Sequence, residues 1–157
     1  MKEQLDRKDF LKVAGAGSAA VAAGAGLPLT KHFIDRSGQL TFRAATGLPR
    51  APLPSYATQI VEGQVDLARG SGLVTSRVLA GHPDDTSLIG LPGLARVIRV
   101  TDVDSEGQRL RLRGLIEDRS QLRRGESPQV EIIVDRKRGL VKAPFLGRSI
   151  EHELGQA

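Results

Sequence analysis

The feature that most constrains the fold is a strict alternation of residue types in segment 61–67. Small or apolar residues occupy its odd positions, and acidic or amide residues occupy its even positions. A period of two places the two sets on opposite faces of an extended strand, whereas a helix face has a period of 3.6. The segment therefore predicts a half-buried β-strand.

Related patterns continue along the chain and are separated by glycine-containing turns. Further strands are predicted at 73–80, 95–103, 108–117, 129–135 and 140–145, with turns at 69–72 and 136–139 and a loop at 81–87. A short helix is conceivable only at 118–125. Regularly spaced hairpins without a long helical pattern predict a mainly β fold, a small antiparallel β-sandwich or barrel.

The buried residues of the hairpin formed by 95–103 and 108–117 restrict its register. Ile98 and Val100 must share a buried face with Leu110 and Leu112, which requires an odd number of residues in the loop between the strands. Ser105–Gly107 fits as a three-residue loop with glycine in the left-handed position. This arrangement places four arginines on the opposite, polar face: Arg99, Arg109, Arg111 and Arg113.

This arginine stripe is a candidate anion-binding surface. Together with the basic turn residues Arg136, Lys137 and Arg138, four guanidinium groups are able to hold phosphates, carboxylates or the acidic surface of a partner. The alternative is a solvated face on which the arginine stems cover apolar atoms and Glu131 and Asp135 screen the charge. The solvated face is the favoured interpretation, and anion binding is the alternative.

The acidic segment before the same turn resembles the first half of a calcium loop. Asp102, Asp104 and Glu106 alternate ahead of Gly107, as carboxylates do in a loop that closes on a hard cation. The twelfth position, where such loops carry a bidentate acid, is Arg113. An acidic hairpin turn is therefore the favoured interpretation, with calcium binding as the alternative.

Other chemistry has little support in the sequence. The chain has no cysteine, which excludes disulfides, thiolate nucleophiles and thiolate metal sites. His32, His82 and His152 lack the spacing of a preorganised metal site. Motifs of serine hydrolases, zinc proteases and P-loop proteins are also missing. We predict no catalytic residue, no cofactor and no metal apart from the calcium candidate, and a non-enzymatic role is favoured.

The N-terminus has the layout of an export signal. A polar start with several basic residues precedes a weakly apolar run at 13–27, which contains the small-x-small sequence Ala23-Gly24-Ala25. Cleavage is expected after Ala25. The run is too short and too rich in glycine and alanine for a secure membrane span.

Within this leader, the segment before the apolar run resembles the twin-arginine (Tat) signal. Arg7, Phe10, Leu11 and Lys12 match that pattern, and Lys8 stands in place of its second arginine. The resemblance covers about thirty residues, and it implies delivery of an already folded protein through the Tat translocase. It carries no information about the mature domain.

These observations divide the chain into four expected parts. Residues 1–25 form the export signal, 26–56 an extended, proline-punctuated linker with a short strand at 40–45, 57–148 the β domain, and 149–157 a polar C-terminal tail.

The function expected from this organisation is that of a bacterial or archaeal exported protein, whether periplasmic, envelope-bound or secreted. It would act as a non-catalytic binding, structural or accessory subunit. Its partners would include an anionic envelope polymer or another protein, and an uncleaved leader would be its only membrane contact. Nucleic acid is not expected, because aromatic residues make up only 3% of the chain. Two alternatives are a small subunit of an exported redox or metal-dependent enzyme complex and a self-assembling envelope protein.

Overall fold

The computed structural model describes residues 33–34, 38–48, 56–83 and 85–155. They are almost entirely β-strand, with one short 3₁₀-helix. The elements are β1 (Phe33–Ile34), β2 (Gln39–Leu48), β3 (Ala57–Asp66), β4 (Ser71–His82), β5 (Asp85–Gly90), β6 (Arg96–Glu106), β7 (Arg109–Ile116), η1 (Arg119–Gln121), β8 (Gln129–Asp135), β9 (Leu140–Phe145) and β10 (Arg148–Leu154).

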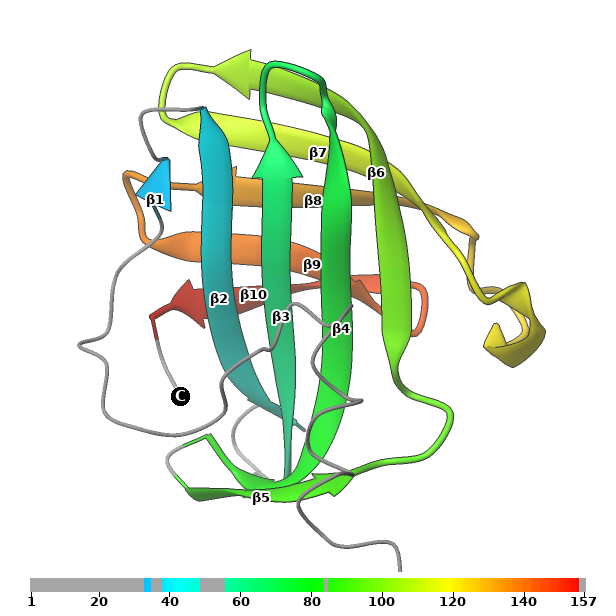
Figure 1. Ribbon diagram of the computed structural model, residues 1–157. Coiled ribbons are helices and arrows are strands. Elements are labelled where there is room, and N and C mark those ends of the chain that lie inside the picture. The colour runs from blue at the N-terminus through cyan, green and yellow to red at the C-terminus, as the bar shows by residue number, and fades with distance from the viewer. Residues whose placement is uncertain (1–32, 35–37, 49–55, 84, 156–157) are drawn as a thin grey trace, which may run out of the picture.

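Eight of these strands form a closed antiparallel barrel (Figure 1). Strands β2, β3, β4, β6, β7, β8, β9 and β10 pair in chain order, and β10 pairs back with β2 to close the ring. Strand β5 lies outside the ring and pairs with β4, while β1 adds a short pairing to β2. The predicted fold class, an antiparallel sandwich or barrel built from hairpins, is confirmed, and the barrel is the form adopted.

The two ends of the barrel differ in their connections. The loop 117–128 connects β7 to β8 at one end, which we call the loop end. The β6–β7 and β8–β9 turns lie at the opposite end, which we call the turn end. In Figure 1 the loop stands out at the right, and the β8–β9 turn is at the left.

The barrel interior is packed with aliphatic side chains. Val61 and Val65 are fully buried and Gly63 lies between them, as the alternation in 61–67 predicts. The core contains Leu40, Phe42, Ala44, Val61, Val65, Val74, Ile98, Val100, Leu110, Leu112, Ile116, Ile132, Val134, Val141 and Ala143. Burying this apolar surface is the main source of stability expected for such a domain.

Two predicted boundaries are wrong. Strand β2 lies inside the predicted linker, and only its central part was expected as a strand. Strand β10 occupies most of the predicted polar tail and completes the ring. Its alternation is real, but the polar residue His152 takes an inward position and is fully buried, so hydropathy alone does not reveal the strand. Residues 49–55 of the predicted linker lie outside the described part.

Two smaller expectations also need correction. The loop expected at 81–87 is shorter than predicted, because β5 begins at Asp85, inside that segment. The segment 118–125 contains the 3₁₀-helix η1 rather than a longer helix.

The β6–β7 turn differs from the predicted one. The strands are joined by Gly107 and Gln108 alone, with Gly107 at a φ of +61°, as a two-residue hairpin with glycine in first place requires. The register shifts between Val100 and Asp102, so Thr101 is the extra residue of a β-bulge. Without the bulge, the alternation that buries Ile98 and Val100 would carry Asp102 into the apolar core.

Candidate anion-binding site

The predicted arginine stripe lies on the outer wall of the barrel, opposite the buried leucines of β7. Because of the bulge, the acidic residues of β6 also point outward and face these arginines across the strand pair. The facing pairs are Asp102 with Arg113, Asp104 with Arg111, and Glu106 with Arg109. The stripe is therefore one row of a mixed-charge surface.

All four stripe arginines also have a carboxylate within ion-pair distance. Arg99 Nη2 lies 2.6 Å from Glu117 Oε1, Arg113 Nη1 lies 2.7 Å from Asp102 Oδ2, Arg109 Nη2 lies 3.3 Å from Asp135 Oδ2, and Arg111 Nε lies 3.7 Å from Glu131 Oε2. Exposed pairs of this kind contribute little stability individually. They do neutralise the stripe, so the solvated, charge-balanced interpretation describes its central part.

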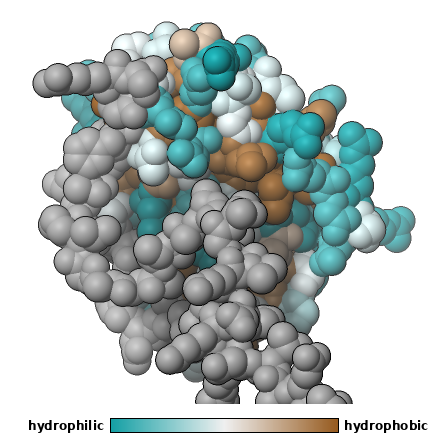
Figure 2. Space-filling model, in the orientation of Figure 1, coloured by the Kyte–Doolittle hydropathy of each residue, from teal (hydrophilic) through white to brown (hydrophobic). Residues whose placement is uncertain are grey.

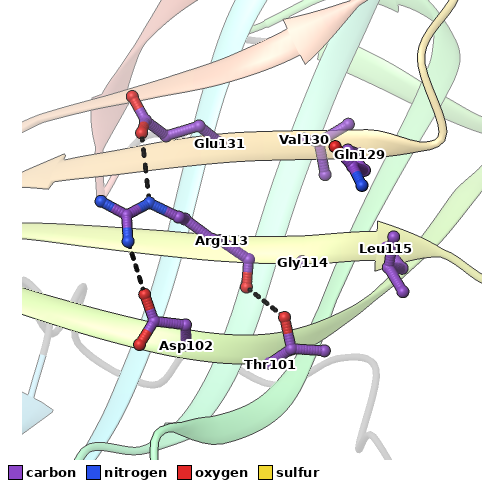
Figure 3. A pocket seen from close by; sticks show the side chains of 8 residues that line it. All are labelled: Thr101, Asp102, Arg113, Gly114, Leu115, Gln129, Val130 and Glu131. Atoms are coloured by element: carbon purple, nitrogen blue, oxygen red, sulfur yellow. Dashed lines mark hydrogen bonds and ion pairs between the residues drawn. The ribbon is translucent and has the colours of Figure 1, made fainter.

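Figure 3 shows the hollow around Arg113, which has a volume of about 500 Å³ on the outer wall beside the bulge. The Arg113 guanidinium lies between Asp102 and Glu131, and Thr101 Oγ1 donates to the Arg113 carbonyl at 3.4 Å. Leu115 also lines the hollow. Both carboxylates lie against the Arg113 guanidinium, so the hollow offers an anion no uncompensated cation.

A second, smaller hollow at the turn end is lined by more cationic than acidic side chains. Arg109 from β7, Arg138 from the β8–β9 turn and Lys142 from β9 line a space of about 70 Å³, beside Ile133 and Leu140. A water molecule occupies roughly 30 Å³ in the liquid, so the space suits one charged group such as a carboxylate or phosphate. We call this the turn-end hollow.

Two carboxylates accompany the three cations of the turn-end hollow. Asp135 lines it, and Glu151 lies 3.2 Å from Lys142 Nζ and 3.8 Å from Arg138 Nη1. A hydrogen bond from the Arg138 backbone N–H, assisted by Arg109, holds the pKa of Asp135 below its ordinary value despite some desolvation. Asp135 is therefore charged at neutral pH, and the cluster carries one net positive charge.

The remaining predicted anion-binding residues lie nearby without lining this hollow. Arg136 Nη2 donates to the Gly107 carbonyl at 2.8 Å, which ties the β8–β9 turn to the β6–β7 turn, and Lys137 is exposed. The structure thus brings Arg109 and Arg138 together and adds Lys142, which the sequence analysis missed. In the β8–β9 hairpin, Lys142 pairs with Ile133. Working out this register from the sequence was the way to place Lys142 near the hollow.

The calcium interpretation is not favoured by the geometry. Asp102, Asp104 and Glu106 lie along the extended strand β6 and face arginines, instead of converging around a loop. Among the residues that the structure describes, no group of three or more histidine or acidic side chains is placed to hold a metal ion.

A buried ion pair at the loop end was not expected from the sequence. Arg96 Nε and Nη2 each lie 2.9 Å from an oxygen of Glu126, and the two side chains are only 8% and 9% exposed. Hydrogen bonding to Arg96 lowers the pKa of Glu126 and outweighs desolvation, while the same bond raises the pKa of Arg96. The pair fastens the loop 117–128 to the barrel.

Next to this pair, other polar side chains of the interior bond to one another. Gln59 Nε2 donates to Ser76 Oγ at 2.8 Å and to the Pro144 carbonyl at 3.2 Å, and Gln59 Oε1 lies 3.0 Å from His152 Nε2. The space between Gln59, Ser76 and the ion pair is about 10 Å³, which is room for one water molecule at most. These groups satisfy each other as a packed polar layer should.

The predicted export motif, cleavage site and His32 lie outside the described residues. Within the described part, no helix has the length and apolar character needed to cross a membrane. The chain matched no protein-family model, no curated protein and no solved structure. Its function has to be inferred from its own geometry.

Proposed function

We propose that this protein is exported to the cell envelope, where it acts as a non-catalytic binding or accessory subunit. The observation that supports this role best is the cation cluster of the turn-end hollow, formed by Arg109, Arg138 and Lys142. The polar layer at the loop end is hydrogen-bonded internally and leaves room for one water molecule at most. The outer wall is therefore the surface that meets a ligand.

The ligand class that suits the turn-end hollow is a polymer with repeated anionic groups. Guanidinium groups bind carboxylates and phosphates in well-defined geometries, and the space accepts one such group at a time. Ile133 and Leu140 provide an apolar lining that weakens competition from water. A polymer keeps many equivalent groups near the site, so a group that dissociates is soon replaced by a neighbour.

The predicted export signal supports a role in the cell envelope. The leader matches the Tat pattern at Arg7, Phe10, Leu11 and Lys12, and the Tat translocase would be its partner. A chain without cysteines needs no oxidising compartment to fold. A reporter fused behind residue 30 should be exported, and replacing Arg7 and Lys8 by glutamine should retain it inside the cell.

Ligand binding is tested with the full chain and two soluble probes, polyphosphate and poly-L-glutamate, by calorimetry at low and high salt. The triple change Arg109→Ser, Arg138→Ser and Lys142→Ser should weaken binding at least tenfold, because the three cations that line the hollow are lost. The matched control Arg99→Ser, Arg111→Ser and Arg113→Ser removes the same charge from the neutralised wall. Equal losses in both variants, or no binding of either probe, would refute the proposed ligand class.

A further inference from the structure

Three arginines of the loop 117–128 stand at the loop end with no carboxylate within ion-pair distance in the described part of the chain, although Glu126 is near enough to Arg123 to interact with it electrostatically. Arg119, Arg123 and Arg124 are exposed, and the loop that carries them projects beyond the barrel wall in Figure 1. Figure 2 shows hydrophilic atoms projecting at the same edge of the molecule. These arginines belong neither to the predicted stripe nor to the turn-end hollow.

The loop has acidic residues of its own, but two of the three bind elsewhere. Glu117 pairs with Arg99 of β6, and Glu126 pairs with the buried Arg96. Asp118 is the third, and its carboxylate accepts hydrogen bonds from the backbone and hydroxyl of Ser120. The exposed part of the loop therefore keeps a surplus of positive charge.

The loop presents its arginines from a fixed backbone. Besides its bond to Glu126, Arg96 donates from Nη2 to the Gln121 carbonyl at 3.1 Å. Glu126 Oε2 in turn accepts from the backbone N–H of Arg123 at 3.0 Å, and Leu122 packs against the core. A partner that binds the loop therefore does not need to order its backbone first.

The neighbouring β9–β10 turn extends the same surface. A Cβ atom placed on Gly147 would lie 3.3 Å from the Gly125 carbonyl, so this turn abuts the loop. The turn carries Arg148, which is exposed, and Leu146, which is 37% exposed. We call Arg119, Arg123, Arg124, Leu146 and Arg148 together the basic rim.

We propose that the basic rim docks the barrel on a bilayer surface that contains anionic lipids. Arginines near such a surface are attracted additively, and a leucine among them adds apolar contact at the headgroup boundary. The rim projects from the barrel and extends over the loop 117–128 and the β9–β10 turn. A surface of this width suits a broad array of headgroups better than a single anionic group. This contact is separate from the expected leader contact and from the turn-end hollow.

The test uses the full chain and vesicles of phosphatidylcholine with or without phosphatidylglycerol, in a sedimentation assay. The leader also carries basic residues, so the contribution of the rim is measured by comparing the wild type with variants that keep the whole leader. The wild type should bind the phosphatidylglycerol vesicles more tightly. The triple change Arg119→Ser, Arg123→Ser and Arg124→Ser should reduce that binding about a hundredfold, without loss of folding, since these side chains make no ion pair within the described residues.

The matched control for charge is Arg69→Ser, Arg111→Ser and Arg113→Ser, three arginines that are paired with carboxylates outside the loop, and it should change vesicle binding by no more than about threefold. The turn-end hollow variant should likewise keep vesicle binding, and the loop variant should keep polyphosphate binding. Equal losses in the loop and control variants would show that net charge alone matters and would overturn the proposal. Equal binding of the wild type to both lipid mixtures would overturn it as well, whatever the polymer experiments show.

Discussion

At the scale of single residues, Gly63 shows how tightly the barrel interior is packed. It faces Phe42 across the β2–β3 pair, and a methyl group at Gly63 would collide with the Phe42 ring. That ring is buried, so it has little room to move aside. Gly63→Ala should lower the free energy of unfolding by about 1–3 kcal/mol, measured by equilibrium urea denaturation.

Gly90 provides the matched control, because nothing lies near the Cβ position that an alanine would occupy there. Gly90→Ala should change stability by less than about 0.5 kcal/mol. Combining Gly63→Ala with Phe42→Leu should cost less than the sum of the two single changes, because both act on one contact. Similar losses at Gly63 and Gly90 would contradict this account.

At this scale the outward-facing arginines and two of their carboxylate partners, Glu131 and Asp135, could be identified from the sequence, whereas Asp102 and Glu117 could not. The alternation around Leu110 and Leu112 fixed the face of Arg109 and its neighbours, because a period-two pattern determines faces directly. The bulge at Thr101 was not visible, and it decides that Asp102 lies beside Arg113. Ionic surroundings depend on register between strands, which a local pattern does not determine.

At the scale of elements, the loop 117–128 depends on the Arg96–Glu126 pair. Hydrogen bonds from Arg96 hold the pKa of Glu126 below that of an unfolded glutamate, about 4.3. The stabilisation is therefore complete above that value and is lost as the pH falls through the lowered folded pKa. Glu126→Gln should cost about 3 kcal/mol at pH 7, and the difference from wild type should shrink on acidification.

The measurement is urea denaturation of both proteins across the acidic pH range. Glu106→Gln is the control, because Glu106 is exposed at the end of β6 and has no ion pair within the described residues. Its effect should be small at every pH. A Glu126→Gln effect that does not vary with pH would mean that the charge of Glu126 contributes nothing.

Most strands could be predicted from the sequence, and the exceptions have a physical cause. The hairpins at β6–β7 and β8–β9 combine apolar alternation with a glycine turn, so both signals agree. In β10 the inward position of His152 is polar, because it bonds to Gln59 inside the barrel. Such a strand is recognisable only once its partner is known.

At the scale of the whole molecule, the barrel depends on one seam between distant parts of the chain. Strands β10 and β2 pair through Glu153 with Ala45 and Leu154 with Ala44, whereas most other neighbouring strands in the ring are joined by hairpins or short connections. Sequence pattern predicted hairpins but could not predict closure, because no local signal links β2 to β10.

The seam can be tested with cysteines in a chain that has none. Ala45→Cys with Glu153→Cys should crosslink on oxidation and stabilise the fold by about 2–4 kcal/mol, because a long loop is closed. The control pair Ala45→Cys with Glu151→Cys is offset by two residues, about 7 Å along β10, because Ala45 faces Glu153. Thermal unfolding under oxidising and reducing conditions provides the readout, and preferential crosslinking of the control pair would contradict the register.

The seam also sets an order of events during synthesis. A ribosome releases β10 after all the other described strands, so every nascent chain exposes the backbone of β2 and β9 until translation has passed Leu154. A chain without β10 thus has two unpaired sheet edges, whereas in the closed barrel β10 pairs with both of them. A chain that lacks β10 would therefore be open to pairing between copies along β2 and β9.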